Sequence, residues 1–385
     1  MPCLNEAETL DRCIKKAFQC FSKNNLNGEV IVSDNGSCDG SQEIAQRSGA
    51  RVVHQYVKGY GAALRKGFDE ARGKYIVMGD ADDSYDFLDV HRFVQKLDEG
   101  YDMVMGTRLK GEIKKDAMPW HHRYFGNPVL TFILNLLYRV GISDAHCGMR
   151  GFRKDAIERM DLRTHGMELA SEMVIKSARA GMKISEIPIT LSPDGRSRPP
   201  HLRSFRDGWR HLRLMLMLAP NTLFIWPGSI LSVLSLIFQV LILANNQIAI
   251  GHVILRENTM ILCMMGAVIG LQMLYLGLFA YLFISPSGDA GRNKQMQLIL
   301  KYSKFEWGIV IGGFLFIAGF IGDALVLKSW AGVEFGELGL KFLRQSIFFS
   351  TVLILGIQMI ISSFFLNMIG VDRTIYAGDL NDKQF

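Results

Sequence analysis

Four apolar segments, each long enough to cross a lipid bilayer, occupy the C-terminal part of the sequence. They lie at about 221–244, 259–285, 307–328 and 346–369. A helix needs about 20 residues to span the hydrocarbon core. Because lipid cannot satisfy backbone polar groups, spanning segments of this length fold as helices. Residues 219–370 are therefore predicted to form a membrane domain of four helices, which makes the chain an integral membrane protein.

The basic residues around these segments predict the orientation of the membrane domain. The loop at 286–306 contains four lysines and arginines and the loop at 245–258 contains one, while a basic stretch at 196–213 precedes the first span. Cytoplasmic loops are enriched in lysine and arginine. The residues before the first span, the 286–306 loop and the tail at 371–385 are therefore expected in the cytoplasm. Two basic residues at 329–345 weaken this assignment.

Residues 1–215 have a different pattern, in which short apolar runs alternate with amphipathic stretches. Strands are expected at 29–33, 51–54, 74–79, 101–105 and 184–191, and helices at 7–21, 41–48, 59–71, 90–98, 167–180 and 201–218. Alternation of this kind predicts an open, mostly parallel sheet. In such sheets ligands bind beyond the carboxyl ends of the strands.

Carboxylates follow two of the expected strands. Asp34 follows the strand at 29–33, and Asp80, Asp82 and Asp83 follow the strand at 74–79. Neighbouring carboxylates repel each other, so a cation is expected among them. Oxygen ligands suit Mg²⁺ or Mn²⁺. The residues alone leave two interpretations open, a metal site or a solvated acidic turn, and Asp83 is expected to be a solvated neighbour.

Other features are less specific. Gly59-Tyr-Gly61 lacks the third glycine of a dinucleotide fingerprint and is interpreted as a turn and helix start. The segment at 120–140 fits equally a helix in the membrane interface and a buried core helix. A lone His146 is more often structural than a ligand. Asp323 lies near the end of a span, where it can reach water.

Net charge and cysteine usage exclude some classes of function. The net charge of +6 is concentrated before the first span, which suits an anionic membrane surface. No nucleic-acid-binding motif accompanies it, so nucleic acid is not an expected partner. The six cysteines include no Cys-x-x-Cys pair, which argues against a zinc site and for a reducing compartment.

Five motifs occur in an order and spacing that resemble a known family. They are Pro2-x-x-Asn5-Glu6, Asp34-x-Gly-Ser37-x-Asp39-Gly40, Gly79-Asp80-x-Asp82, Gly106-Thr-Arg108 and Ser185-Glu-Ile-Pro-Ile189. Together they resemble the family 2 glycosyltransferases over residues 1–215, and most of all the polyprenyl-phosphate (dolichol-phosphate type) mannosyl- and glucosyltransferases. The resemblance implies the α/β GT-A fold, a nucleotide-diphospho-sugar transferase fold with a Rossmann-like, mostly parallel sheet.

The resemblance also implies roles for individual residues. The donor nucleotide would be bound by Pro2, Leu4, Asn5, Glu6, Asp34 and Ala81. Asp80 and Asp82 would hold Mg²⁺ or Mn²⁺ on the donor diphosphate, with Asp82 as the direct ligand. The acceptor phosphate would be bound by Arg108, Arg123, Asn127, Arg196 and Arg198. The residues expected to act in catalysis are Asp82, Arg108 and Arg123, and Arg108 is expected at the end of its strand.

The implied reaction moves a hexose from GDP-mannose or UDP-glucose to a polyprenyl or dolichyl phosphate. A phosphate monoester is already nucleophilic at neutral pH, so no strong general base is needed, and in-line attack predicts inversion. Two alternatives stay open. In the first alternative, the sugar acceptor is a lipid hydroxyl group, which would need a general base, and Asp144 or Glu172 are candidates for it. In the second alternative, the protein is a non-enzymatic subunit that transports lipid-linked sugars. The sequence leaves homo-oligomerisation open.

Two departures from the family pattern are expected to matter. The family has an apolar strand before Pro-x-x-Asn-Glu, whereas this chain begins at the motif, so the start is expected to be misassigned or the sequence truncated, with an apolar segment encoded upstream. The Gln-x-x-Arg-Trp motif of processive polysaccharide synthases is absent. That absence argues against a cellulose- or hyaluronan-type synthase.

Overall fold

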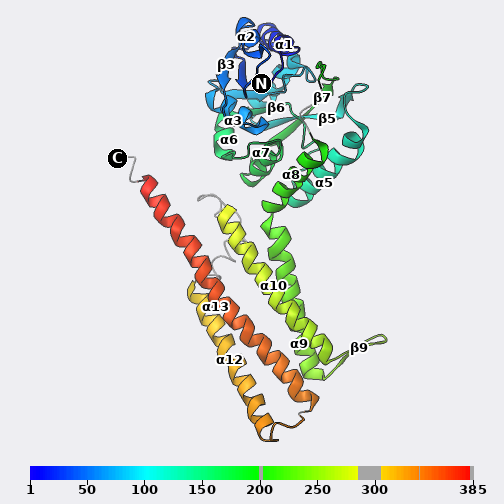
Figure 1. Ribbon diagram of the computed structural model, residues 1–385, viewed down its shortest axis with the longest axis vertical. Coiled ribbons are helices and arrows are strands. Elements are labelled where there is room, and N and C mark those ends of the chain that lie inside the picture. The colour runs from blue at the N-terminus through cyan, green and yellow to red at the C-terminus, as the bar shows by residue number, and fades with distance from the viewer. Residues whose placement is uncertain (199–202, 285–304, 338, 382–385) are drawn as a thin grey trace. The chain divides into compact units, whose positions relative to one another are not determined.

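The computed structural model describes residues 1–198, 203–284, 305–337 and 339–381 (Figure 1). The chain divides into two compact units, Met1–Leu218 and Ala219–Phe385. This boundary lies within a few residues of the one predicted from hydropathy.

The N-terminal unit contains a small parallel sheet in the order β1-β2-β3. Its strands are β1 (Pro2–Cys3), β2 (Ile31–Asp34) and β3 (Arg51–His54). The sequence predicted a loop at Pro2–Cys3. The structure corrects this, because β1 pairs in parallel with β2 and the Met1 ammonium donates to the Ile31 carbonyl at 2.8 Å.

A second sheet of this unit has the order β4-β6-β5-β7. Its strands are β4 (Tyr75–Met78), β6 (Arg150–Arg153), β5 (Met103–Ile113) and β7 (Ile184–Leu191). The β5–β7 pair is parallel, whereas β6 is antiparallel to both of its neighbours. The sequence did not predict β6, because the strand has only four residues and an arginine at each end.

Helices surround these strands at the positions that the apolar pattern predicted, with some shifted ends. They are α1 (Leu10–Lys23), α2 (Ser41–Arg47), α3 (Tyr60–Glu70), α4 (Val90–Asp98), α5 (Asn127–Tyr138), α6 (Lys154–Met160), α7 (Leu169–Arg179) and α8 (Ser204–Met217). The helix α1 shows the cause of the pattern. Its buried residues Leu10, Cys13, Ile14 and Ala17 follow the spacing of one helical face. The sequence did not predict α6.

The segment at 120–140 forms a π-helical turn (His122–Gly126) followed by α5, instead of one continuous helix. One face of α5 is in the core, where Leu134 is fully buried. The other face exposes Phe132 and Leu136. The interpretation as a core helix is confirmed for the buried face, and the interpretation as a helix in the membrane interface stays a prediction, which the apolar outer face suits.

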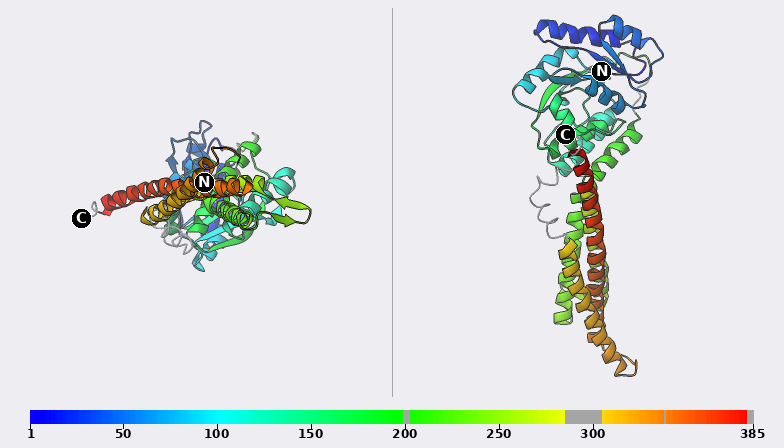
Figure 2. Two further views of the ribbon diagram at one scale, coloured as in Figure 1. Left: turned by 90° about the horizontal axis from the view of Figure 1, so that it is seen from below. Right: turned by 90° about the vertical axis from the view of Figure 1, so that its left-hand side faces the viewer.

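The C-terminal unit contains four helices that are long and apolar enough to cross a membrane among the residues described. They are α9 (Trp226–Asn245), which a π-helical turn at Asn221–Ile225 precedes, α10 (Glu257–Ile284), α12 (Phe305–Ala331) and α13 (Leu340–Asn381). The four predicted spans are confirmed. The loop between the first two forms a hairpin of β8 (Ile248–Ile250) and β9 (Val253–Leu255), which was not predicted (Figure 2).

Small residues allow these helices to pack closely. A side chain on Gly312 would meet the Gly356 carbonyl at 2.9 Å, so α12 and α13 touch through their backbones. Such contacts are typical of membrane helix pairs. Asp323 accepts a hydrogen bond from Ser350 at 3.0 Å, so it is bound between the same two helices. The basic residues at 286–304, on which the predicted orientation depends, lie outside the described residues.

Candidate active site

The acidic run after β4 holds three aspartates in three different environments. Asp80 accepts a hydrogen bond from the Tyr60 hydroxyl at 2.8 Å. Burial, and then the neighbouring Asp82 carboxylate, raise the pKa of Asp80. Asp83 is ion-paired with Lys16 at 2.7 Å and its side chain is only 13% exposed, which corrects the expectation of a solvated residue. Asp83 therefore ties the run to α1, whereas Asp80 and Asp82 contact residues of other segments, Tyr60 and Arg196.

Two arginines of the loop before α8 reach the acidic run and the N-terminal motif. Arg196 binds Asp82 Oδ2 through Nη2 at 2.8 Å and Glu6 Oε1 through Nη1 at 3.0 Å. Arg198 binds the same Glu6 oxygen at 2.8 Å and donates to the Leu4 carbonyl at 2.9 Å. Both were expected at the acceptor phosphate, and the structure places them against expected donor residues.

The N-terminal motif and the end of β2 are joined by hydrogen bonds. The Asn5 N–H donates to Ser37 Oγ at 2.9 Å, and Asn5 Oδ1 accepts from the Cys38 N–H at 2.9 Å. Asp34 is buried and accepts from the N–H groups of Gly36 and Ser37. These contacts bring the expected nucleotide-binding residues of two distant segments together at one edge of the small sheet.

Two further residues that are expected to bind the donor nucleotide, Pro2 and Ala81, lie beside the N-terminal motif. Pro2 is in β1, where it pairs with Ser33. Ala81 is buried, and its carbonyl accepts a hydrogen bond from the Thr9 hydroxyl at 2.7 Å. That bond joins the acidic run to the N-terminal segment, so the two expected halves of a donor site are in direct contact.

Arg108 lies inside β5 and not at its end, which corrects the sequence expectation. The pairing of β5 with β7 is interrupted between Thr107 and Glu112. Such an irregularity frees backbone groups from the ladder. The Arg108 N–H therefore donates to Asp144 Oδ2 at 3.1 Å, and its guanidinium makes two further bonds to the Asp144 carboxylate at 2.7 and 2.8 Å. The guanidinium nitrogen Nη1 makes no hydrogen bond to any residue that the structure describes.

The Arg108–Asp144 pair has a definite charge state. Burial alone would raise the pKa of Asp144, but Arg108 outweighs it and the pKa is lowered. Asp144 is thus an ionised carboxylate whose oxygens hold Arg108 in a fixed orientation. Forked pairs of this kind are the stronger class of charge-assisted hydrogen bond.

The other expected acceptor residues have local contacts instead. Arg123 lies over the Tyr124 ring, 5.4 Å from its centroid, and Asn127 donates to Met118 Sδ at 3.6 Å. Neither contacts Arg108 in the described part of the chain. Arg123 belongs to the π-helical turn, which exposes Tyr124 and Phe125, and Trp120 just before the turn is exposed as well.

The part of the α5–β6 connection that runs from Asp144 to Gly148 was not predicted as a linked part of the site, although Asp144 was named as a candidate base. It begins at Asp144, which binds Arg108, and reaches Gly148, where an added Cβ would lie 2.5 Å from Asp80 Oδ2. The Gly148 N–H donates to the Tyr85 hydroxyl at 2.9 Å. This segment therefore links the arginine of β5 to the carboxylates after β4. Its signal was the cluster Asp-x-His-Cys-Gly-Met-Arg, which no rule of spacing identifies.

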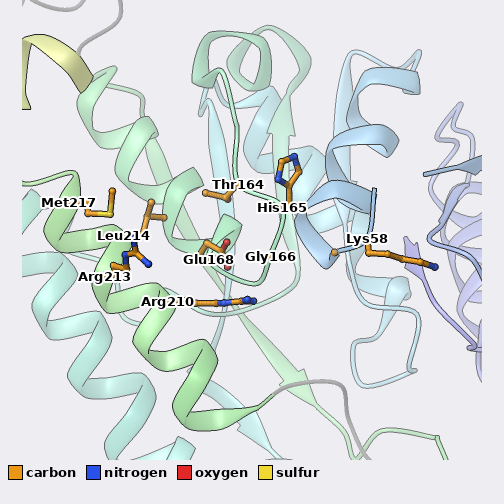
Figure 3. Close-up of a pocket in the computed structure, with 10 residues that line it drawn as sticks. Lys58, Thr164, His165, Gly166, Glu168, Arg210, Arg213, Leu214 and Met217 are labelled. Atoms are coloured by element: carbon orange, nitrogen blue, oxygen red, sulfur yellow. The ribbon is translucent and has the colours of Figure 1, made fainter. Parts of the chain in front are cut away.

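A pocket of about 370 Å³ opens elsewhere in the same unit (Figure 3). It is lined by Lys58, Gly59, Thr164, His165, Gly166, Glu168, Arg210, Arg213, Leu214 and Met217. A side chain at Gly59 would overlap the His165 carbonyl, so the glycine allows the helix start to pack against this loop. That contact agrees with the interpretation of Gly59-Tyr-Gly61 as a turn and the start of a helix. None of the site residues expected from the sequence lines the pocket.

The carboxylates of Asp80 and Asp82 fit a divalent cation. No group of three or more histidine, cysteine, aspartate or glutamate side chains is arranged to hold a metal in the described residues. Mg²⁺ is commonly bound by one or two carboxylates together with substrate phosphates and water. The contact of Asp82 with Arg196 shows that this carboxylate accepts a cationic partner.

Comparison with known proteins identifies relatives of both units. Residues 1–161 match the glycosyl transferase family 2, and residues 287–370 match the glycosyltransferase family 2 C-terminal transmembrane region. The low-salt glycan biosynthesis hexosyltransferase Agl6 of Haloferax volcanii is 37% identical over 371 residues, which cover 96% of this chain and 88% of that protein.

Two further comparisons cover a smaller share of the chain. The dolichyl-phosphate hexose transferase of Haloferax volcanii is 33% identical over 162 residues, 42% of this chain and 68% of its own length. The crystal structure of glucosyl-3-phosphoglycerate synthase from Mycobacterium tuberculosis is 20% identical, with a TM-score of 0.45 over 57% of this chain and 78% of its own.

Proposed function

The chain belongs to glycosyltransferase family 2 and is a membrane glycosyltransferase with a GT-A domain, and on that premise we propose a specific reaction for it. The protein transfers a hexose from a nucleotide-diphosphate sugar, GDP-mannose or UDP-glucose, to a polyprenyl or dolichyl phosphate. An acceptor phosphate oxygen forms a bond to the anomeric carbon as the bond from that carbon to the nucleotide diphosphate breaks. In-line attack inverts the configuration at this carbon.

The observation that supports a phosphate acceptor is the state of the two candidate bases. Asp144 is held by Arg108, and the pKa of Asp144 is lowered. Glu172 accepts from the N–H of Thr164 at 2.9 Å and pairs with Lys176 at 2.7 Å. A hydroxyl acceptor needs a base with free lone pairs and a pKa near the working pH. A phosphate monoester needs none, so these carboxylates favour it over a hydroxyl lipid.

The positive groups have separate tasks in this proposal. Arg108 presents Nη1, which makes no hydrogen bond to a described residue, to the acceptor phosphate, while Asp144 keeps the guanidinium oriented. Arg123 and Asn127 complete the acceptor site from the neighbouring turn and helix. Arg196 and Arg198 belong to the donor end, next to Glu6. Arginine suits phosphate because its donors form a planar fork.

Asp80 and Asp82 would hold Mg²⁺ or Mn²⁺, with Asp82 as the direct ligand. A metal bound there neutralises the charge that develops on the leaving diphosphate. The nucleotide would bind to Pro2, Leu4, Asn5, Glu6, Asp34 and Ala81, which surround the loop after β2. The unit that carries these residues faces the cytoplasm in this proposal.

The experiment that tests the proposal is a donor and acceptor screen with the purified full-length protein in lipid vesicles. GDP-mannose and UDP-glucose are each offered with Mg²⁺ or Mn²⁺, and polyprenyl phosphate competes with diacylglycerol and ceramide. We expect the sugar to be transferred to polyprenyl phosphate with inversion. Transfer to a hydroxyl lipid in preference to the phosphate would overturn the assigned acceptor.

A further inference from the structure

His146 carries two buried ring nitrogens that lack a partner. Neither Nδ1 nor Nε2 is hydrogen-bonded to any of the described residues, and both atoms are inaccessible to solvent. A neutral imidazole has one hydrogen-bond donor and one acceptor, and leaving both without a hydrogen bond in a protein interior costs free energy. Groups of this kind are uncommon and need an explanation, such as a catalytic or binding role.

The position of His146 points to the proposed acceptor site. It lies two residues after Asp144, the partner of Arg108, and two residues before Gly148, which abuts Asp80. The imidazole is within the electrostatic influence of Arg108 and of His122, which precedes Arg123. Along the chain, His146 therefore lies between the residue that binds Arg108 and the residue that abuts Asp80, and its backbone N–H donates to Asp144 Oδ1 at 3.3 Å.

The charge around His146 favours an anion. The guanidinium of Arg150 is fully buried and donates to the carbonyls of Ala145, Cys147 and Ala170. No carboxylate pairs with Arg150 in the part of the chain described. Buried charges are normally paired. Arg150, whose hydrogen bonds to described residues go to neutral groups, adds positive potential around His146, which an incoming phosphate complements.

A second histidine fixes the orientation of the ring. His211 of α8 packs edge-on against His146, with centroids 4.5 Å apart, and its Nδ1 is bonded to Ser171 Oγ at 2.8 Å. Burial lowers the pKa of His146 well below its usual value, and the cations nearby add to this. The ring is thus neutral at physiological pH and offers one N–H as a donor.

We propose that His146 is a binding residue for the acceptor phosphate, and that its ring N–H donates to a phosphate oxygen that Arg108 Nη1 also contacts. This inference rests on the proposed function and extends its site by one neutral donor. A neutral donor adds no charge to a region that already holds Arg108 and Arg150. It therefore positions the phosphate without holding it so tightly that nucleophilicity is lost.

The test compares three variants of the full-length protein in detergent micelles. His146→Phe keeps an aromatic ring against His211 but removes both nitrogens, and His146→Gln keeps an N–H donor. His211→Phe is the matched control, because it alters the same ring pair without touching the proposed ligand. The readouts are KM for polyprenyl phosphate, KM for the donor, and the thermal midpoint.

We expect His146→Phe to raise KM for polyprenyl phosphate by about tenfold or more, with KM for the donor within about twofold. His146→Gln should recover part of the loss. His211→Phe should lower the thermal midpoint and leave KM for the lipid within about twofold. A wild-type lipid KM in His146→Phe would overturn the inference, as would an equal increase in KM for lipid and donor.

Direct binding separates this inference from the proposed function. Affinity for polyprenyl phosphate without donor is measured by competition with a fluorescent lipid phosphate. If the wild type transfers no sugar to this lipid but His146→Phe still weakens its binding tenfold, the reaction is wrong and the phosphate site stands. If both proteins bind the lipid phosphate equally, the role of His146 is wrong whatever the reaction.

Discussion

Arg196 Nη2 lies 2.8 Å from Asp82 Oδ2, so the carboxylate proposed to bind the metal is paired with an arginine. The same guanidinium binds Glu6 and Asp194 at 3.0 Å each. A guanidinium and a divalent cation cannot share one carboxylate oxygen at full strength. If Asp82 binds the metal as proposed, we expect donor binding to include an exchange of partners at Asp82, in which Arg196 becomes available for the phosphates of the donor.

Arg196→Ala should strengthen the binding of metal alone. Removing the competing cation frees Asp82, and we expect the Kd for Mn²⁺ without nucleotide to fall threefold or more, on the order of 1 kcal/mol. Electron paramagnetic resonance of free Mn²⁺ measures this. Arg12→Ala is the control, since Arg12 contacts Asp83 at 3.5 Å and not Asp82. Unchanged or weaker Mn²⁺ binding in Arg196→Ala would contradict the exchange.

Asp82→Ala should abolish transfer while the protein still inserts and folds. The variant removes the proposed direct metal ligand, and we expect turnover to fall by at least about 100-fold, in the range typical of lost electrostatic stabilisation. Asp83→Asn is the control, because Asp83 binds Lys16 and is directed to α1. It should lower stability by about 1 kcal/mol with turnover within a few-fold. Undiminished transfer by Asp82→Ala would refute the metal role.

Asp144→Asn should impair both stability and acceptor binding. The change leaves Arg108 buried without its carboxylate, and breaking a buried pair costs about 3–5 kcal/mol. Asp144→Glu, which keeps the charge, should recover part of the loss. Thermal unfolding measures the first effect and KM for the lipid phosphate the second. A stable Asp144→Asn protein with an unchanged lipid KM would show that Asp144 does not orient Arg108.

The sequence was sufficient to predict the elements whose residues carry a periodic pattern. The spans, α1, α4 and the strands β2, β3, β5 and β7 followed from hydropathy alone, because burial imposes a pattern that is visible in the chain. The short strand β6 and the strand β1 were missed. Their stability comes from neighbours far away in the sequence, as when Arg150–Arg153 pairs with both β4 and β5.

The candidate site also has a part that the sequence predicts and a part that it does not. Asp80, Asp82 and Arg108 could be named as candidates because polar residues come after apolar runs of the sequence, and their roles stay predictions. The partners that define their chemistry could not, because Tyr60, Asp144 and Arg196 reach them from segments that are 20, 36 and 114 residues away. A single chain gives no sign of such pairings. The irregularity in β5 that turns Arg108 toward Asp144 is likewise invisible before folding.

His211 should make the stability of the protein depend on pH between about 5 and 7. Burial, and then the charge of Arg150, lower the pKa of His211 to about 4, against an ordinary value of 6.5. The unfolded chain therefore binds a proton in this range that the folded chain excludes. By linkage, stability falls as pH drops below 6.5 and continues to fall until pH 4. The loss for this one histidine is roughly 1 kcal/mol between pH 7 and pH 5.5.

His211→Phe removes the group that binds this proton. Comparison with the wild type therefore isolates the contribution of His211 to the pH dependence of stability. The variant loses the bond to Ser171, so its thermal midpoint at pH 7 should be lower than that of the wild type. Its further decrease between pH 7 and pH 5.5 should be smaller, because one fewer group is protonated on unfolding. Trp209, two residues away on α8, provides a fluorescence signal for the transition. Parallel pH dependence in the two proteins would mean that His211 is already protonated in the folded state, against the buried, Ser171-bonded ring that the structure shows.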